Sequence, residues 1–270
     1  DSYRSYADLN RKYIVWNVFA APELSLEPVS SCFLFVGCLS YRGFFDEAQA
    51  RRDAASLEAG GNDVFVGGVA AYSTLGWFDD PVLNTMLVWD DLRIVEVIFH
   101  ELAHQLHYTE GDTAFNEGFA TAVAEIGVAR WLESRHGVEK RNEYLARRQR
   151  EQHVNQMLFD LRERLQNLYH TDLPAQKMRN EKERIITEFK NKITALGQAD
   201  PKFQPLAGWA RRPVNNALLG AVGVYNQRVP AFLNLFEKTD RDFSAFFAKV
   251  RQLTHLEKTE RDSRLKALIK

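Results

Sequence analysis

The residue types that could do chemistry gather in one stretch, "FHELAHQLHYTEGDTAFNEGFATAV", residues 99–123. It begins with the pattern His-Glu-x-x-His, formed by His100, Glu101 and His104. On a helix, residues four apart lie one turn apart on nearly the same face, so both imidazoles can bind one metal ion at about 2 Å. Glu101 is rotated by about 100° from His100. This position suits a base that activates a zinc-bound water rather than a third ligand.

Three residues are candidates for the third metal ligand. His107 lies on the same helical face but about 4.5 Å further along the axis than His104, which is too far for comfortable closure on one ion. Glu110 stands ten residues after the first histidine, where metzincins place a ligand, but that geometry needs a glycine at the position that His107 occupies. Glu117 follows in "FNEGFATAV".

The sequence favours Glu117. Asn116 or Thr113 can cap a new helix, and "TEGD" at residues 109–112 supplies a turn that lets this helix pack antiparallel to the first. Two histidines and one glutamate leave a fourth coordination position open, which is typical of catalytic zinc. We therefore predict a Zn²⁺ site formed by His100, His104 and Glu117.

Composition describes an ordinary globular protein. The chain of 270 residues is 45% hydrophobic and 26% charged. A formal net charge of -1 gives no overall field for attraction to nucleic acid or an anionic membrane. The charged runs "EKRNEYLARRQR" and "RNEKER" interleave acids with bases, so we interpret them as solvated helix faces and predict no nucleic-acid partner.

Hydrophobic patterns predict an α+β fold with a small mixed β-sheet and a predominantly helical remainder. Strands are predicted at 13–19, 32–36 and 63–72, with a helix before the third. From residue 91 onward the pattern is helical, and the helix bearing the histidines should pack against the helix bearing Glu117. We predict a single domain over 1–270, made of a sheet part (1–90), zinc-site helices (91–135), a helical hairpin (140–196) and C-terminal helices (213–270).

The two cysteines, Cys32 and Cys38, are separated by a short segment with a glycine. This spacing permits a small disulfide loop, and buried free thiols are the alternative. The pattern favours the disulfide, and hence an oxidising compartment.

The chain also resembles known proteins. "HELAHQ" followed by "NEGFA" resembles the gluzincin metallopeptidases, whose aminopeptidase N branch takes its third zinc ligand from that pentapeptide, here Glu117. "SYRSYADLN", "VWNVFAAPELSLEP", "SYRGFF" and "GGVAAYSTLGWFDDP" are similar to a bacterial family of predicted aminopeptidases. The resemblance implies a zinc aminopeptidase of the periplasm or cell envelope that acts on peptides. It also implies a lipid anchor upstream of this chain. The link from His104 to Glu117 is shorter than in the aminopeptidase N branch.

Further parts of an active site are expected from the chemistry of amide hydrolysis. A donor must stabilise the oxyanion, and gluzincins use a tyrosine or histidine well downstream. Tyr225 in "LLGAVGVYNQ" is our candidate. Four others stay open: Tyr144, Tyr169, His153 and His170.

Substrate contacts are predicted upstream of the histidines. "FVGGVAAY" should form an edge strand that binds the substrate as an added strand, with Gly67 and Gly68 permitting close approach. The resemblance to the aminopeptidase N branch also implies an acid in this stretch that holds the free amine. This stretch has none, and the possible replacements are Glu96, Asp79, Asp80 and Glu110. Candidates for the acceptors of the histidines' second ring nitrogens are Asp112 and Thr121.

The sequence therefore predicts a zinc-dependent peptidase, and it favours an aminopeptidase. Two other hypotheses stay open. The first is a zinc hydrolase of another amide, such as a cell-wall stem peptide. The second is a binding or scaffolding protein of the cell envelope that keeps the fold without turnover.

Overall fold

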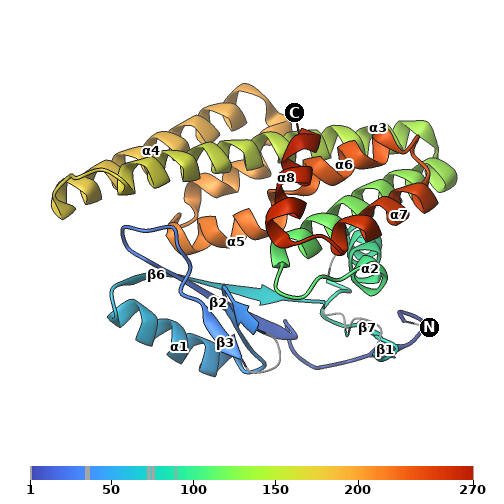
Figure 1. Cartoon of the computed structure of the whole chain (residues 1–270), viewed down its shortest axis with the longest axis horizontal. Coiled ribbons are helices and arrows are strands. Elements are labelled where there is room, and N and C mark those ends of the chain that lie inside the picture. The colour runs from blue at the N-terminus through green and yellow to red at the C-terminus, as the bar shows by residue number, and fades with distance from the viewer. Residues whose placement is uncertain (1, 34–36, 72–73, 75–76, 89, 270) are drawn as a thin grey trace.

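The central strand of the sheet is β2 (Val15–Pro22), which pairs antiparallel with β5 (Arg42–Phe44) on one side and β6 (Asn62–Val69) on the other. The structure is a computed structural model that describes residues 2–33, 37–71, 74, 77–88 and 90–269. The order β5-β2-β6 leaves β6 as an outer strand. Its C-terminal end runs toward α2 (Asp91–Leu106), the helix that carries the histidine motif (Figure 1).

Helices cover both faces of this sheet because β2 is apolar on both sides. Trp16 and Val18 face α1 (Glu47–Ala59) and form one small core with it. Phe19 faces the other way and packs on α5 (Asn216–Asn226). Figure 1 shows α1 beneath the sheet and α5 above it, with α3 and α4 beyond α5. The predicted α+β class is confirmed.

Four shorter strands complete the described β-structure. β1 (Tyr6–Ala7) pairs parallel with β7 (Val82–Leu83), and β3 (Ser31–Phe33) pairs antiparallel with β4 (Gly37–Leu39). The predicted strand at 32–36 overlaps β3, and its residues 34–36 lie outside the described residues.

The two cysteines belong to this hairpin. Cys32 and Cys38 stand opposite each other in the backbone register of β3 and β4. Their side chains lie outside the described part of the structure, so the disulfide stays a prediction.

Two long helices extend from the site. α3 (Thr113–Tyr169) bends at Gly137, where φ is 86° and ψ is 172°, a conformation that favours glycine. Beyond the bend α3 runs beside α4 (Ala175–Ala199), and the two form the arm seen at the top of Figure 1. The arm is held by an apolar seam: Val154, Leu158, Leu161, Leu165, Leu168, Ile185, Phe189 and Ile193.

The C-terminal helices close the molecule over the start of α3. Two short 3-10 helices (Pro201–Phe203 and Leu206–Arg211) precede α5. α6 (Val229–Lys238), α7 (Phe243–Thr254) and α8 (Lys258–Ile269) then pack around a phenylalanine-rich core shared with α3. Within the described residues, no helix combines the length and apolar character needed to cross a membrane.

Candidate metal centre

The turn between α2 and α3 determines how the two helices face each other. α2 ends at Leu106, and His107 is already extended (φ -144°, ψ 124°). The chain reverses through Gly111, whose φ of 73° suits glycine. Asp112 then starts α3 by accepting a hydrogen bond from the backbone N–H of Phe115 at 3.2 Å. The predicted turn at residues 109–112 therefore joins two adjacent helices.

Two side chains hold this turn. The amide of Asn116 accepts from the N–H of Thr109 and donates to its carbonyl, both at 2.8 Å. Asp112 is 2% exposed and accepts from Arg261 of α8 at 2.8 and 3.0 Å. A buried, doubly bonded ion pair strongly resists displacement of either partner. The start of α3 is thus fixed from two directions.

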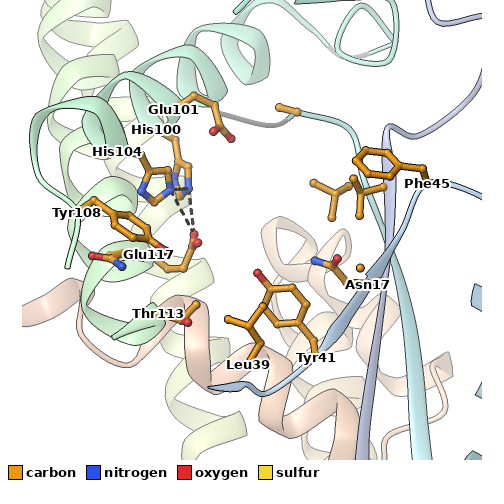
Figure 2. A pocket seen from close by; sticks show the side chains of 15 residues that line it. Asn17, Leu39, Tyr41, Phe45, His100, Glu101, His104, Tyr108, Thr113 and Glu117 are labelled. Atoms are coloured by element: carbon orange, nitrogen blue, oxygen red, sulfur yellow. Dashed lines mark hydrogen bonds and ion pairs between the residues drawn. The ribbon is translucent and has the colours of Figure 1, made fainter. Parts of the chain in front are cut away.

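Three predicted ligands meet in the structure. His100 Nε2 lies 3.1 Å from Glu117 Oε2 and 3.2 Å from His104 Nε2. His104 Nε2 lies 3.8 Å from the same carboxylate oxygen. All three ligand atoms lie within 4.8 Å of one another, a spacing that could hold a metal ion. Figure 2 shows the two imidazoles from α2 facing the Glu117 carboxylate from α3.

Burial and mutual charge shift the pKa values of these groups. Burial lowers the pKa of His104 to about 4. Burial disfavours the imidazolium of His100 as well, but the hydrogen bond and charge of Glu117 outweigh it and raise its pKa. Burial also disfavours the Glu117 carboxylate, yet the hydrogen bond and charge of His100 lower its pKa. A neutral His104 and an ionised Glu117 are the forms that bind metal ions.

Glu101 lies beside the cluster but takes no part in it. Its carboxylate is directed into the cavity rather than toward Glu117 (Figure 2). Burial raises the pKa of Glu101 to about 7, against the opposing charge of His100. A carboxyl group with a pKa near neutrality is well matched to accept and return protons.

The cluster forms one wall of a cavity of about 400 Å³ between α2, α3 and the sheet. Asn17 is 7% exposed, and its amide points into this cavity from β2. Tyr41, from the segment between β4 and β5, directs its hydroxyl across the cavity toward the cluster (Figure 2). Tyr108 lies next to Glu117. These three residues were not predicted. Tertiary packing brings Asn17 and Tyr41 to the site, whereas Tyr108 directly follows the end of α2.

A second cavity of about 420 Å³ lies on the other side of His100 and Glu101, which line both. Glu96, one of the predicted amine-binding acids, lines it one helical turn before His100. Its carboxylate is bound to Arg93 at 2.6 Å and lies 3.4 Å from Arg148. Both cavities meet at the end of β6, around residues 69–71.

The other sequence candidates near the motif lie elsewhere. His107 donates from Nε2 to the carbonyl of Phe247 at 3.1 Å and packs in the C-terminal core. Glu110 is exposed in the turn. Asp112, a candidate acceptor for a histidine, binds Arg261 instead. Thr121, the other candidate acceptor, lines the second cavity. The Nδ1 of His104 is buried and has no hydrogen-bond partner within the described part of the chain.

Two acids and the remaining aromatic candidates also have defined places. Asp79 is exposed, and Asp80 is buried and accepts from the N–H of Thr74 at 3.0 Å. Tyr225 belongs to the last turn of α5, but its side chain lies outside the described part, so its role stays a prediction. The four open candidates do not line the first cavity: Tyr144, Tyr169, His153 and His170.

The glycines of β6 leave room for aromatic rings of this chain. A Cβ on Gly68 would lie 2.3 Å from the ring of Tyr13, and one on Gly67 would lie 3.2 Å from the ring of Phe65. Gly68 therefore makes room for an aromatic ring of this chain. That these glycines also permit close approach of a substrate stays a prediction.

Comparison with known proteins gives one positive result. No match is found among the curated proteins, and none among the solved structures. A family described as "Putative aminopeptidase" matches residues 1–265, nearly the whole chain. The chain that carries the cluster of His100, His104 and Glu117 therefore belongs to the putative aminopeptidase family.

Proposed function

We propose that this protein is a zinc-dependent aminopeptidase. The single observation that carries the proposal is the convergence of His100, His104 and Glu117 on one point, with Glu101 beside them in an open cavity. Membership of the aminopeptidase family supports peptide substrates.

The separations among the three ligand atoms fit zinc. Tetrahedral zinc with bonds of about 2.0–2.1 Å spaces its ligand atoms about 3.3 Å apart. The three distances here are 3.1, 3.2 and 3.8 Å. Two imidazoles and one carboxylate also match the donor set of catalytic zinc, which leaves a position for water or substrate. His100, His104 and Glu117 would hold the ion.

Each residue then has a role in peptide hydrolysis. When bound, zinc supplies a Lewis acid that polarises the carbonyl and makes water more acidic. Glu101 takes a proton from the attacking water as its oxygen bonds to the carbonyl carbon. It returns the proton to the departing amine nitrogen as the C–N bond breaks. The hydroxyl of Tyr41 points toward the same space, so we assign it as the donor to the developing oxyanion, with Tyr225 as the alternative.

The outer strand β6 provides a surface for an extended substrate. The Val64 carbonyl accepts from the side chain of Asn215 at 2.9 Å, so its peptide group faces the outer edge. Because peptide groups alternate along a strand, those of Val66 and Gly68 face the same way and lead toward the metal site. A peptide added there would bring its scissile carbonyl to the cluster.

Glu96 is the acid we assign to the substrate's amine. Of the four acids considered, it alone lines a cavity that His100 and Glu101 share. Its surroundings hold as many bases as acids. Arg148 contacts Glu96, Glu125 and Glu151, Arg93 also binds Glu96, and Arg147 lies 3.5 Å from Glu151. An α-ammonium group placed against the Glu96 carboxylate in this cavity would be attracted by its negative charge.

The test combines metal analysis with hydrolysis. The protein is purified without a metal-chelating tag, bound zinc is measured by elemental analysis, and free and N-blocked peptides are tested as substrates. We expect near-stoichiometric zinc, loss of zinc in Glu117→Ala, and retained zinc with at least a hundredfold lower kcat in Glu101→Gln. The control Glu110→Gln, an exposed acid of the same turn, should match wild type.

Other outcomes separate the alternatives. Cleavage of N-blocked peptides as fast as free ones would remove the amine-binding role of Glu96 and the aminopeptidase assignment. Zinc without turnover of any peptide or cell-wall amide would favour a scaffold. The envelope location is part of the proposal, and cell fractionation of the native gene product tests it.

A further inference from the structure

A third cavity, of about 180 Å³, lies between the sheet and helices α3 and α5. Its walls are mostly apolar, and they include Phe19, Leu26, Pro28 and Ala217. One side chain of the lining is charged: Arg162, from the arm of α3. An arginine facing an apolar cavity is unusual, because a guanidinium needs either water or an anion.

Arg162 has no anionic partner in the described part of the chain. It forms no hydrogen bond or ion pair there, whereas its neighbour Arg164 is bound to Glu188 at 2.6 Å. Burial lowers the pKa of Arg162, and the charge of Glu27, which is exposed, offsets this only in part. Arg162 is thus a partly buried cation that no carboxylate of the described residues contacts directly, and the charge of Glu27 balances it only in part.

Helix α5 is shaped around this guanidinium. A Cβ on Gly223 would lie 2.3 Å from Nη1 of Arg162, so glycine at this position makes room for the charged group. One turn earlier, a Cβ on Gly220 would meet nothing within 4 Å, although Gly220 lines the cavity. Gly223 therefore makes room for the guanidinium, and Gly220 leaves space in the cavity.

The cavity adjoins the one that holds the metal cluster. Leu39 and Tyr41 line the metal cavity, while Ser40 between them lines the third cavity. Along β2, Asn17 lines the first and Phe19, on the same face, lines the third. At about 3.3 Å per residue, the step from Asn17 to residues 19–21 is about 7–13 Å. An extended peptide spans that distance with about two to four residues.

We infer that the third cavity binds a carboxylate attached to an apolar group, with Arg162 as its charge partner. We further infer that this carboxylate is the C-terminus of a short peptide whose scissile bond lies at the metal cluster. The second statement rests on the proposed function, and the first does not. A guanidinium binds a carboxylate through two parallel hydrogen bonds, and the apolar walls suit an apolar last residue. The protein would then select short peptides with a free C-terminus.

Direct binding tests the first statement without any need for activity. The probes are N-acetyl-leucine and N-acetyl-leucinamide, which differ in the carboxylate, and binding is measured by titration calorimetry. We expect the acid to bind at least tenfold more tightly than the amide, and Arg162→Gln to remove this preference. Arg162→Lys should keep part of it, because the charge remains. The control Arg164→Gln should keep all of it.

A second variant checks the cavity itself. A Cβ on Gly220 would meet nothing within 4 Å, so Gly220→Leu should keep the fold, as judged by thermal unfolding. Its side chain should fill the cavity and weaken the binding of both probes at least tenfold. Equal affinity of wild type for acid and amide would overturn the inference, whatever the variants do. So would an acid preference that survives Arg162→Gln.

Kinetics then identify the source of the carboxylate. Leucyl tripeptides with a free or amidated C-terminus are compared. A kcat/KM at least tenfold higher for the free acid, lost in Arg162→Gln, supports the peptide C-terminus. Acid binding without a kinetic preference would refute that second statement and leave a separate carboxylate ligand. If no peptide is cleaved, the proposed function fails, and calorimetry still decides whether Arg162 binds a carboxylate.

Discussion

Replacing Arg261 by methionine should destabilise the protein and weaken metal binding at the candidate centre, although Arg261 does not contact the three ligands. Arg261 lies on α8, 4% exposed, and donates to Asp112 at 2.8 and 3.0 Å and to the Leu256 carbonyl at 2.9 Å. Its guanidinium also lies 5.2 Å from the ring centroid of Phe115. Methionine keeps the length of the side chain but leaves Asp112 without its buried partner.

The magnitude follows from the burial of both groups. Removing one partner of a buried ion pair costs about 3–5 kcal/mol. Lys258 remains 3.6 Å from Asp112, but it is 56% exposed and compensates only weakly, so we expect about 3 kcal/mol. For a chain of this size, that loss lowers Tm by about 6–12 °C. Because Asp112 begins the helix that carries Glu117, zinc affinity should also fall about tenfold or more.

The assay is thermal unfolding of the metal-free protein, followed by zinc titration. Arg264→Met is the control, because Arg264 lies on the same helix but is 67% exposed in its pair with Glu260, where a change costs under about 1 kcal/mol. In the double variant Asp112→Asn with Arg261→Met, stability should partly recover, since asparagine still caps α3 and carries no charge. A Tm for Arg261→Met within about 2 °C of wild type would refute the reasoning.

Three more predictions concern the site. Tyr41→Phe should lower kcat about a hundredfold with little change in KM, and Tyr225→Phe, tested in parallel, should do so only if the oxyanion donor is that residue instead. Zinc at about a thousand times its Kd should add about 4 kcal/mol to the stability of the apo protein, measured as a rise in Tm, and Glu117→Ala should abolish that rise. Asn116→Ala should cost about 1–3 kcal/mol, because the partly buried N–H and carbonyl of Thr109 lose their partners. Urea unfolding measures this, and a loss under about 0.5 kcal/mol would contradict it.

The site was predictable from sequence wherever local geometry determines it. His100 and His104 follow from helical spacing, and Glu117 from a turn whose residues can be read directly. Their meeting in one cluster needed only that two consecutive helices pack against each other. Local rules of this kind act over one or two turns of chain.

The opposite wall of the site was not predictable in this way. Tyr41 follows a hairpin of three-residue strands, too short to give a periodic signal. Asn17 reads as an interruption of an apolar strand, and only the packed sheet shows that it faces the metal cavity. Gly68 makes room for the ring of Tyr13, a contact between residues that are distant in sequence.

The bend at Gly137 has a consequence for how this protein can tolerate insertions. The same helix supplies Glu117 before the bend and Arg148 and Arg162 after it. Adding one residue between 137 and 162 would rotate everything beyond it by about 100° and swing Arg162 out of its cavity. Insertions and deletions should therefore be tolerated at the exposed turn of residues 170–174. Within the arm they should damage the third cavity, because the number of residues after Gly137 determines where Arg162 lies.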